Sequence, residues 1–159
     1  MDKQNCPFCN CAVDKSAVIL YENKNIIVRL DLFPITPRHL IVFPKGHIED
    51  LTDLSSEVWL DLLDGIKNAK RLTQTSDFKA LYTHIINTPF SEKSTAFIKA
   101  ALESPFINKI PDAYNIGNNE GEAAGRSIDH CHIHIVPRYW GDVKNPRGGI
   151  RGIFGNGNY

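Results

Sequence analysis

The sequence predicts an α+β protein in which helices cover an antiparallel sheet mainly on one face. Three observations predict this class: short β-branched segments up to Phe43, apolar residues at helical spacing in the middle, and strand-like segments again after Pro111. The 159 residues match one domain with a proper core, so we expect a single domain over residues 1–159. The 18 Lys and Arg balance 18 Asp and Glu, which argues against a general nucleic-acid-binding surface.

The first third of the chain predicts an antiparallel meander. Residues 18–21, 26–30 and 40–43 are rich in β-branched side chains, as strands are. The polar residues 22–25 form a break short enough for a hairpin turn. Pro34 and Pro37 indicate an extended loop that cannot lie inside a sheet. The three strands are therefore expected to pair in chain order.

The middle of the chain predicts one long helix, whose start Asp53 or Ser55 can cap. Apolar residues at three- and four-residue steps give this helix one stripe, made of Trp59, Leu62, Leu63, Ile66, Ala69 and Leu72. A second helix is expected from about Glu92 to Glu103, carrying Phe97, Ala100 and Ala101 and ending before Pro105. No role is assigned to residues 73–111.

The last part of the chain predicts two more strands, at residues 113–116 and 132–136. A turn rich in Gly and Asn at residues 117–121 follows the first of them. Residues 141–159 are rich in Gly, Asn and Arg and are expected to form a loop-like tail. The order is thus strands, helix, helix, strands.

The compartment and the use of cysteine are predicted together. No stretch approaches the roughly 18 uncharged apolar residues of a membrane helix, and the N-terminus lacks a basic region followed by an apolar run, so a cytoplasmic protein is expected. Cys6, Cys9 and Cys11 crowd one end while Cys131 stands alone, which is a poor disulfide framework. Cys6-Pro7-Phe8-Cys9 is half of a tetrahedral zinc site within residues 1–16, although free thiols or a redox pair are the alternatives.

Three of the six histidines, His130, His132 and His134, alternate over five residues. In a strand they would share one face, in a row about 7 Å apart, with Cys131 and Ile133 facing the core. A row of imidazoles without a ligand is the bland alternative, but such a row costs desolvation. Metal binding and phosphate chemistry both explain it.

Donor groups just upstream favour phosphate over metal. Asn119, the Gly125 backbone and Ser127 offer hydrogen-bond donors to phosphate oxygens. A metal centre would instead call for a nearby carboxylate, and Asp129 is expected on the opposite strand face.

The sequence resembles the histidine-triad family of nucleotide hydrolases and transferases. Three segments carry the resemblance: His130-Cys131-His132-Ile133-His134, the preceding Gly125-Arg126-Ser127 with Asn119-Glu120-Gly121, and the block of residues 30–47. The resemblance covers most of the chain except residues 73–111, and it implies a histidine-triad fold and a homodimer.

The resemblance implies a covalent mechanism. His132 would attack the α-phosphorus of a nucleotide as a neutral imidazole, held in one tautomer by a carbonyl. His134 would hold an α-phosphate oxygen and Ser127 would reach the leaving side. The Gly125 to Ser127 backbone and Asn119 would stabilise the charge that develops.

Two further residues have both a family role and a plainer one. Asp31 would accept from the ribose hydroxyls, or it simply caps the turn before Pro34. His39 would support the histidine row, or it is a histidine at the edge of the core.

The chain departs from many family members at Arg126, where they carry Gln. A cation can neutralise a departing phosphate, which favours polyphosphate over amine leaving groups.

The family resemblance also completes the zinc site. Members with an N-terminal cysteine pair use two histidines that correspond to His47 and His130 here. Such a closed four-ligand zinc would be structural, so no catalytic metal is expected.

The tail resembles that of bacterial members described as diadenosine polyphosphate hydrolases. Arg147 and Arg151 among glycines would suit a long phosphate chain, although a solvated basic loop is the alternative. Trp140 would stack on a base or pack at a dimer contact.

Together these features predict a nucleotidyl hydrolase that acts on dinucleoside polyphosphates. The alternatives are a nucleoside phosphoramidase, a nucleotidyl transferase, a nucleotide-binding module with little turnover, and a three-histidine metalloenzyme. The expected partners are a nucleotide and a second copy of the chain, with no nucleic acid and no membrane.

Overall fold

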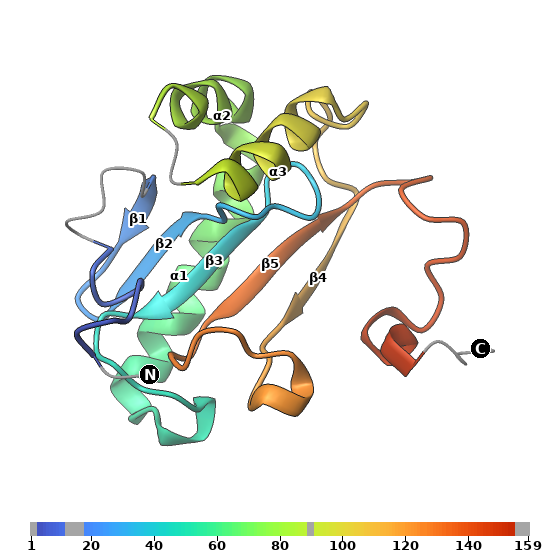
Figure 1. Ribbon diagram of the computed structural model, residues 1–159. Coiled ribbons are helices and arrows are strands. Elements are labelled where there is room, and N and C mark those ends of the chain that lie inside the picture. The colour runs from blue at the N-terminus through green and yellow to red at the C-terminus, as the bar shows by residue number, and fades with distance from the viewer. Residues whose placement is uncertain (1–2, 12–17, 89–90, 155–159) are drawn as a thin grey trace.

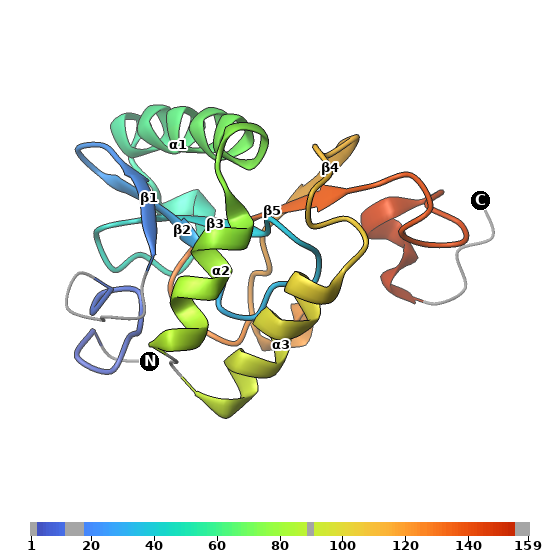
Figure 2. The same cartoon turned by 90° about the horizontal axis from the view of Figure 1, so that it is seen from above.

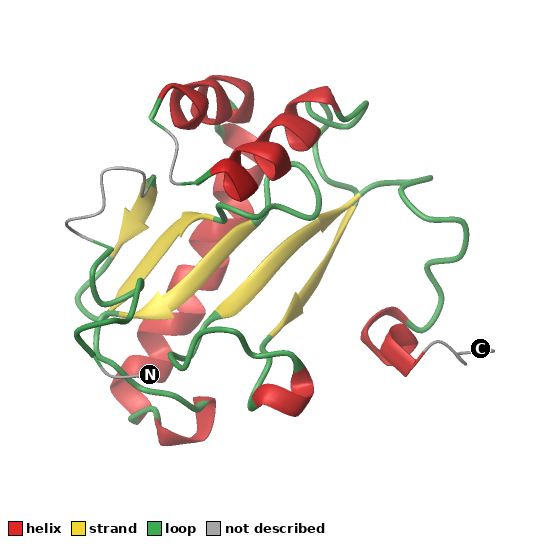
Figure 3. Cartoon of the chain, viewed as in Figure 1, coloured by secondary structure: helices red, strands yellow, loops and turns green. Residues whose placement is uncertain are grey.

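The computed structural model describes residues 3–11, 18–88 and 91–154. Five strands form one antiparallel sheet in the order β1-β2-β3-β5-β4. The strands are β1 (Ile19–Glu22), β2 (Ile26–Leu30), β3 (Leu40–Pro44), β4 (Ala113–Gly117) and β5 (Ile133–Arg138). The α+β class with one antiparallel sheet is confirmed (Figures 1 and 3). Of the predicted terminal segments, residues 1–2, 12–16 and 155–159 lie outside the described residues.

Three helices accompany the sheet: α1 (Ser56–Thr75), α2 (Phe78–Asn87) and α3 (Glu92–Glu103). Helix α1 crosses one face, while α2 and α3 lie beside each other near one end of the strands (Figures 1 and 2). Ile26, Val42 and Leu62 belong to the main core, which lies between α1 and the sheet and extends to α2 and α3. No helix in the described part of the chain is long and apolar enough to cross a membrane.

Helix α1 begins as predicted, but its buried face only partly matches the predicted stripe. Ser55 caps it, because its hydroxyl accepts from the Val58 N–H at 3.4 Å. The buried residues are Leu62, Gly65, Ala69 and Thr73, whereas Trp59 and Leu63 remain 43% and 48% exposed. The apolar stripe was therefore only partly a core stripe.

Gly65 explains why the helix turns this face to the sheet. An ideal Cβ at this position would lie 2.9 Å from both Ile26 Cγ2 and Val42 Cγ1. The missing side chain lets the helix approach β2 and β3 more closely than any other residue would allow.

The segment without an assigned role contains helix α2, which the sequence analysis missed. Asp77 caps it by accepting from the Ala80 N–H at 3.0 Å. The Tyr82 hydroxyl, fully buried, accepts from the Arg38 N–H at 2.8 Å. Arg38 has a φ of 71°, and its guanidinium donates to the Thr73 carbonyl at 2.6 Å. This segment therefore stabilises the proline loop between β2 and β3.

Helix α3 has the expected bounds, but its buried face only partly matches the predicted one. Ser91 and Ser94 form a capping box at its start. Ile98 and Ala101 are buried, whereas Ala100 is exposed. The tail also differs from the expected loop, because residues 149–154 form a 3₁₀ helix.

Candidate active site

The register of the sheet places functional side chains in rows on the face away from α1. Arg29 of β2 pairs with Ile41 of β3, Ile41 pairs with His134 of β5, and His134 pairs with Gly117 of β4. Residues at equal register that alternate with the core residues share one face of a sheet. Asp31 lies two residues beyond Arg29, and its N–H donates to the His39 carbonyl at 3.1 Å.

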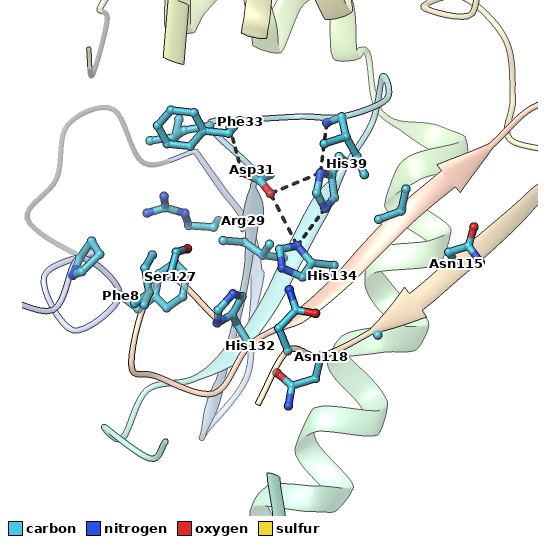
Figure 4. Close-up of a pocket in the computed structure, with 18 of the residues that line it drawn as sticks. Phe8, Arg29, Asp31, Phe33, His39, Asn115, Asn118, Ser127, His132 and His134 are labelled. Carbon is cyan, nitrogen blue, oxygen red and sulfur yellow. Dashed lines mark hydrogen bonds and ion pairs between the residues drawn. The ribbon is translucent and has the colours of Figure 1, made fainter. Parts of the chain in front are cut away.

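A cavity of about 640 Å³ opens over this face (Figure 4). Its polar and charged lining residues are Arg29, Asp31, His39, Lys93, Asn115, Asn118, Asn119, Ser127, His132 and His134. Pro7, Phe8, Leu32, Phe33, Ile35, Ile41, Gly117, Ile128, Val136 and Ile150 supply the remaining wall. The cavity thus brings together Asp31, His39, Asn119, Ser127, His132 and His134, six of the residues that the sequence predicted for this site.

His132 is held in the tautomer that leaves one ring nitrogen toward the cavity. Its Nδ1–H donates to the His130 carbonyl at 2.7 Å, so Nε2 carries the lone pair. The side chain is 5% exposed, and burial lowers its pKa below the usual value, which keeps the ring neutral. A neutral imidazole with a free Nε2 is chemically able to act as a nucleophile.

The predicted row of evenly spaced histidines is wrong. Strand β5 begins at Ile133, so His130 and His132 lie in the irregular segment before it. The ring centroids of His132 and His134 are therefore 5.0 Å apart rather than about 7 Å. His130 turns away to other partners, while Cys131 and Ile133 face the core as expected.

Asp31, His39 and His134 form a hydrogen-bonded chain along the cavity wall. His39 Nε2 lies 3.1 Å from His134 Nδ1, and His39 Nδ1 lies 3.3 Å from Asp31 Oδ2. The carboxylate favours a proton on Nδ1, because the bond from Nδ1–H to Asp31 is charge-assisted. This proton replaces the weak hydrogen bond that the Ile35 N–H, 3.5 Å away, could otherwise donate to Nδ1. His39 Nε2 then accepts from His134 Nδ1–H, which leaves His134 Nε2 unprotonated.

Asp31 caps the turn before Pro34, one of its two predicted roles, and His39 lies beside His134 as its predicted supporting role requires. Asp31 Oδ1 accepts from the Phe33 N–H at 2.8 Å, so Asp31 caps the turn while its other oxygen faces His39. Burial lowers the pKa of His39, against the opposing effect of Asp31, and burial also lowers the pKa of His134. One ligand atom from each of the three lies within 4.8 Å of the others, but all three already bond to one another.

Arg126 does not face the cavity, contrary to the prediction from its position in the motif. Its Nη1 lies 2.7 Å from Asp50 Oδ1, and its Nε lies 3.2 Å from Asp129 Oδ1. Nη1 also donates to the Glu49 carbonyl at 3.2 Å. Arg126 therefore fixes the residues just before η1 (Leu51–Asp53). The preference for polyphosphates that was inferred from Arg126 loses its basis.

Gly125 is also used internally. It has a φ of 88°, which favours glycine, and its N–H donates to the Glu122 carbonyl at 2.9 Å. That N–H is thus not free for a phosphate. Ser127, two residues later, lines the cavity.

The predicted arginines of the tail are not brought to the cavity. Within the described residues, neither Arg147 nor Arg151 belongs to the lining, whereas Ile150 between them does. Both arginines are exposed. Trp140 is also exposed, at 81%.

The four predicted zinc ligands converge in a pattern that fits a metal; they are Cys6, Cys9, His47 and His130. Cys6 Sγ lies 3.3 Å from His130 Nδ1, and Cys9 Sγ lies 3.3 Å from His47 Nδ1 and 3.7 Å from His130 Nδ1. In a tetrahedral zinc site with usual bond lengths, a sulfur and a nitrogen are about 3.5 Å apart. All four ligand atoms lie within 4.8 Å of one another.

The surroundings of His130 also suit a metal ligand. Its Nε2–H donates to the Pro44 carbonyl at 2.8 Å, which leaves the Nδ1 lone pair toward the two thiols. Burial lowers the pKa of His130 to about 4, so the ring is in the neutral form that metals bind. The cysteine and histidine donors match those of structural zinc sites.

Phe8 and Arg29 are among the lining residues that the sequence analysis missed. Phe8 lies between the two cysteines, stacks on Phe43 at 4.5 Å and meets the His132 ring edge-on at 5.0 Å. The Arg29 guanidinium lies 5.6 Å from the Phe8 ring centroid. The signal for Arg29 was available: a charged residue inside a run of β-branched residues, two positions before Asp31.

Comparisons with known proteins identify the family. A family model described as HIT domain matches residues 13–141. "Protein hit" of Bacillus subtilis is 31% identical over 137 residues, which cover 86% of this chain and 72% of that protein.

Two other matches bear on zinc and nucleotides. The crystal structure of a Zn-bound histidine triad family protein from Mycobacterium smegmatis has a TM-score of 0.55 and 30% identity, covering 89% of this chain and 80% of that one. The AP-4-A phosphorylase of Mycobacterium tuberculosis is 26% identical over 132 residues, which cover 82% of this chain but 51% of that protein. The matched residues, the sheet and the cavity lead to one conclusion: the chain belongs to the HIT domain family of nucleotide-processing proteins.

Proposed function

We propose that this protein hydrolyses dinucleoside polyphosphates through a covalent nucleotidyl intermediate on His132. The observation that carries the proposal is the hydrogen bond from His132 Nδ1 to the His130 carbonyl, which leaves Nε2 free beside Ser127 and Asn119. Nε2 attacks the α-phosphorus, a P–N bond forms, and the P–O bond to the rest of the phosphate chain breaks. Water then attacks the phosphorus and breaks the P–N bond, which regenerates the neutral histidine.

The neighbouring groups would serve the charge that develops. His134 donates to an α-phosphate oxygen from Nε2 once that nitrogen takes up a proton, and the Asn119 amide donates to another. Ser127 reaches the leaving oxygen, and Asp31 accepts from the ribose. The chain from Asp31 through His39 holds the ring of His134 in one orientation, which supports pre-organisation of the phosphate site.

The AP-4-A phosphorylase relative favours a second acceptor, inorganic phosphate in place of water. The first step is the same in both cases, because the acceptor enters only when the P–N bond breaks. Neither the exposed tail arginines nor Arg126, which pairs with Asp50 and Asp129, lines the cavity. The arginines therefore do not disfavour a phosphoramidase, which is the alternative within the family.

We also propose a structural zinc held by Cys6, Cys9, His47 and His130. With four protein ligands the site is closed, so the zinc would act as a cross-link between the N-terminal segment, the end of β3 and the residues before β5. Residues 1–159 would then form one HIT domain, with a zinc-type segment at 1–16 and a tail at 141–159.

A homodimer is the assembly that we propose. Its support is a set of apolar side chains exposed on α1, namely Trp59, Leu60 and Leu63. Size-exclusion chromatography with light scattering tests this, because a monomeric mass at working concentrations would contradict it.

The experiment for the activity compares diadenosine tetraphosphate with adenosine 5′-phosphoramidate, each with EDTA and with or without inorganic phosphate. Cleavage of the tetraphosphate to AMP and ATP supports hydrolysis, and ADP in place of AMP when phosphate is present supports phosphorolysis. Cleavage of the phosphoramidate alone would replace the proposal with the phosphoramidase.

The nucleophile is tested by His132→Ala, with His84→Ala as the matched control. His84 is an exposed histidine in the last turn of α2 and lies outside the cavity lining. We expect no turnover from the first variant and the wild-type rate from the second. Full activity of His132→Ala would refute the covalent mechanism.

A further inference from the structure

Arg29 is a buried cation that the proposed chemistry does not use. It lies in the middle of β2 and is 5% exposed. Among the described residues its Nε has no hydrogen-bond partner, and none of the ion pairs between these residues includes Arg29. Its Nη1 lies 3.6 Å from Cys11 Sγ, a weak acceptor. A buried charge without a counterpart is costly, so a ligand is the natural partner.

Two other arginines with little exposed side chain, Arg38 and Arg126, differ from Arg29 because they have strong acceptors within the protein. Arg38 donates to the carbonyls of Thr73 and Ile107, and Arg126 pairs with Asp50. Their terminal nitrogens thus serve the protein itself. Arg29 instead lines the cavity, as Figure 4 shows.

The position of Arg29 defines what it meets. It shares a row of the sheet with Ile41 and His134, so its Cα lies about two strand spacings, or roughly 10 Å, from that of His134. The β4 side of His132 carries the amides of Asn118 and Asn119, whereas Arg29 lies on the β2 side beside Phe8 and Ile41.

A nucleotide whose α-phosphorus lies at His132 extends in two directions, with the phosphate chain on one side and the nucleobase on the other. Its charged phosphate chain suits the side with amide donors, and its flat apolar base suits the wall formed by Phe8 and Ile41. The edge of that base then faces the guanidinium of Arg29.

We propose that Arg29 reads the edge of the nucleobase and selects guanine over adenine. This inference rests on the proposed function, because it takes His132 as the place of the phosphorus. A guanidinium presents two parallel N–H donors, and guanine offers the adjacent acceptors O6 and N7. Adenine offers N7 beside the N6 amino group, which is a donor and opposes the guanidinium.

The test measures binding of GMP and AMP to the full-length protein by isothermal titration calorimetry. We expect GMP to bind at least about fivefold more tightly, the lower end of what one bidentate contact gives. Arg29→Met is expected to bring the ratio close to one. Arg29→Gln is expected to favour AMP, since a Gln amide pairs with adenine N6 and N7.

Lys93→Met is the matched control. Lys93 is the other Lys or Arg in the cavity lining, and its Nζ lies 6.0 Å from the Phe33 ring centroid. Its loss is expected to weaken both nucleotides by the same factor and leave the ratio unchanged. Thermal unfolding of each variant confirms that binding is measured on folded protein.

Each contrary outcome overturns the inference in its own way. Equal affinities of the wild type for GMP and AMP would show that the base is not read. If Arg29→Met weakened both nucleotides equally, Arg29 would be binding phosphate. No binding of either nucleotide would remove the proposed function as well, whereas cleavage of a dinucleoside polyphosphate without any base preference would remove only the role of Arg29.

Discussion

Replacing Cys6 and Cys9 with Ser is predicted to release residues 3–11 from the sheet while the rest of the protein stays folded. These nine residues are the described N-terminal segment, which ends at Cys11. Ordering them costs about 1–2 kcal/mol each, or about 9–18 kcal/mol in total. The question is whether their own contacts offset this cost.

Their own contacts supply at most about 11 kcal/mol, which offsets only the lower part of this cost. Cys6, Phe8 and Cys11 are buried against Ile41 and Phe43, and complete burial contributes at most about 3 kcal/mol for each side chain. The two backbone hydrogen bonds within the segment add about 1 kcal/mol each. A structural zinc contributes about 10–16 kcal/mol in zinc-finger peptides, which is enough to make up the difference.

Hydrogen–deuterium exchange with mass spectrometry measures this release peptide by peptide. In the double variant we expect residues 3–11 to exchange freely and the β2 and β3 peptides to remain protected. Zinc content, measured by elemental analysis, is expected to fall from one per chain to none. Cys11→Ala is the control, since it removes a buried thiol of the same segment that is not a zinc ligand, and it should retain zinc.

The prediction fails if residues 3–11 stay as protected in the zinc-free variant as in the wild type. The segment would then be held by its apolar contacts alone, and the four-ligand cluster would have no structural role. Absence of zinc from the wild-type protein would lead to the same conclusion.

Three further predictions concern the site and the core. His132→Ala should bind AMP within about threefold of the wild type although it does not turn over substrate; a large loss of affinity in calorimetry would mean that the ring mainly binds. Gly65→Ala should lower the free energy of unfolding by about 1 kcal/mol in urea denaturation, because overpacking against Ile26 and Val42 costs about 1–3 kcal/mol while the helix gains about 1 kcal/mol; a more stable variant would contradict this packing. Burial lowers the pKa of His39, so on acidification the unfolded chain takes up a proton on this ring before the folded protein does. Stability should therefore fall as pH drops below about 6.5. A urea midpoint that is higher at pH 5.5 than at pH 7.5 would contradict this.

The sheet could be predicted because each strand carries a local signal. The exact packing face of α1 could not be predicted from the sequence. Trp59 and Leu63 follow helical spacing as well as Leu62 does, and periodicity alone gives no weight to Gly65. The close approach at Gly65 depends on Ile26 and Val42, which are far away in the sequence. Helix α2 was missed because its short apolar pattern follows directly on α1, after Ser76 and the Asp77 cap.

The site was predictable where a motif names the residue, and less so where a side chain chooses between partners. Asp31 and His39 lie together because adjacent strands place them at equal register. Arg126 follows its motif in sequence, yet Asp50 and Asp129 offer it carboxylates that no local pattern reveals. Arg29 is the opposite case, because it lacks a carboxylate partner among the described residues. Only the fold shows this lack.

His130 contributes to two tasks through chemically independent parts of one residue. Its ring faces the thiols, and its backbone carbonyl holds the Nδ1 proton of His132. Every amino acid carries that carbonyl, so a lineage could discard the metal by changing the ring without disturbing the nucleophile's tautomer, provided that another contact replaced the lost cross-link. The proposed zinc site is therefore separable in evolution from the proposed chemistry, even though both use the same position.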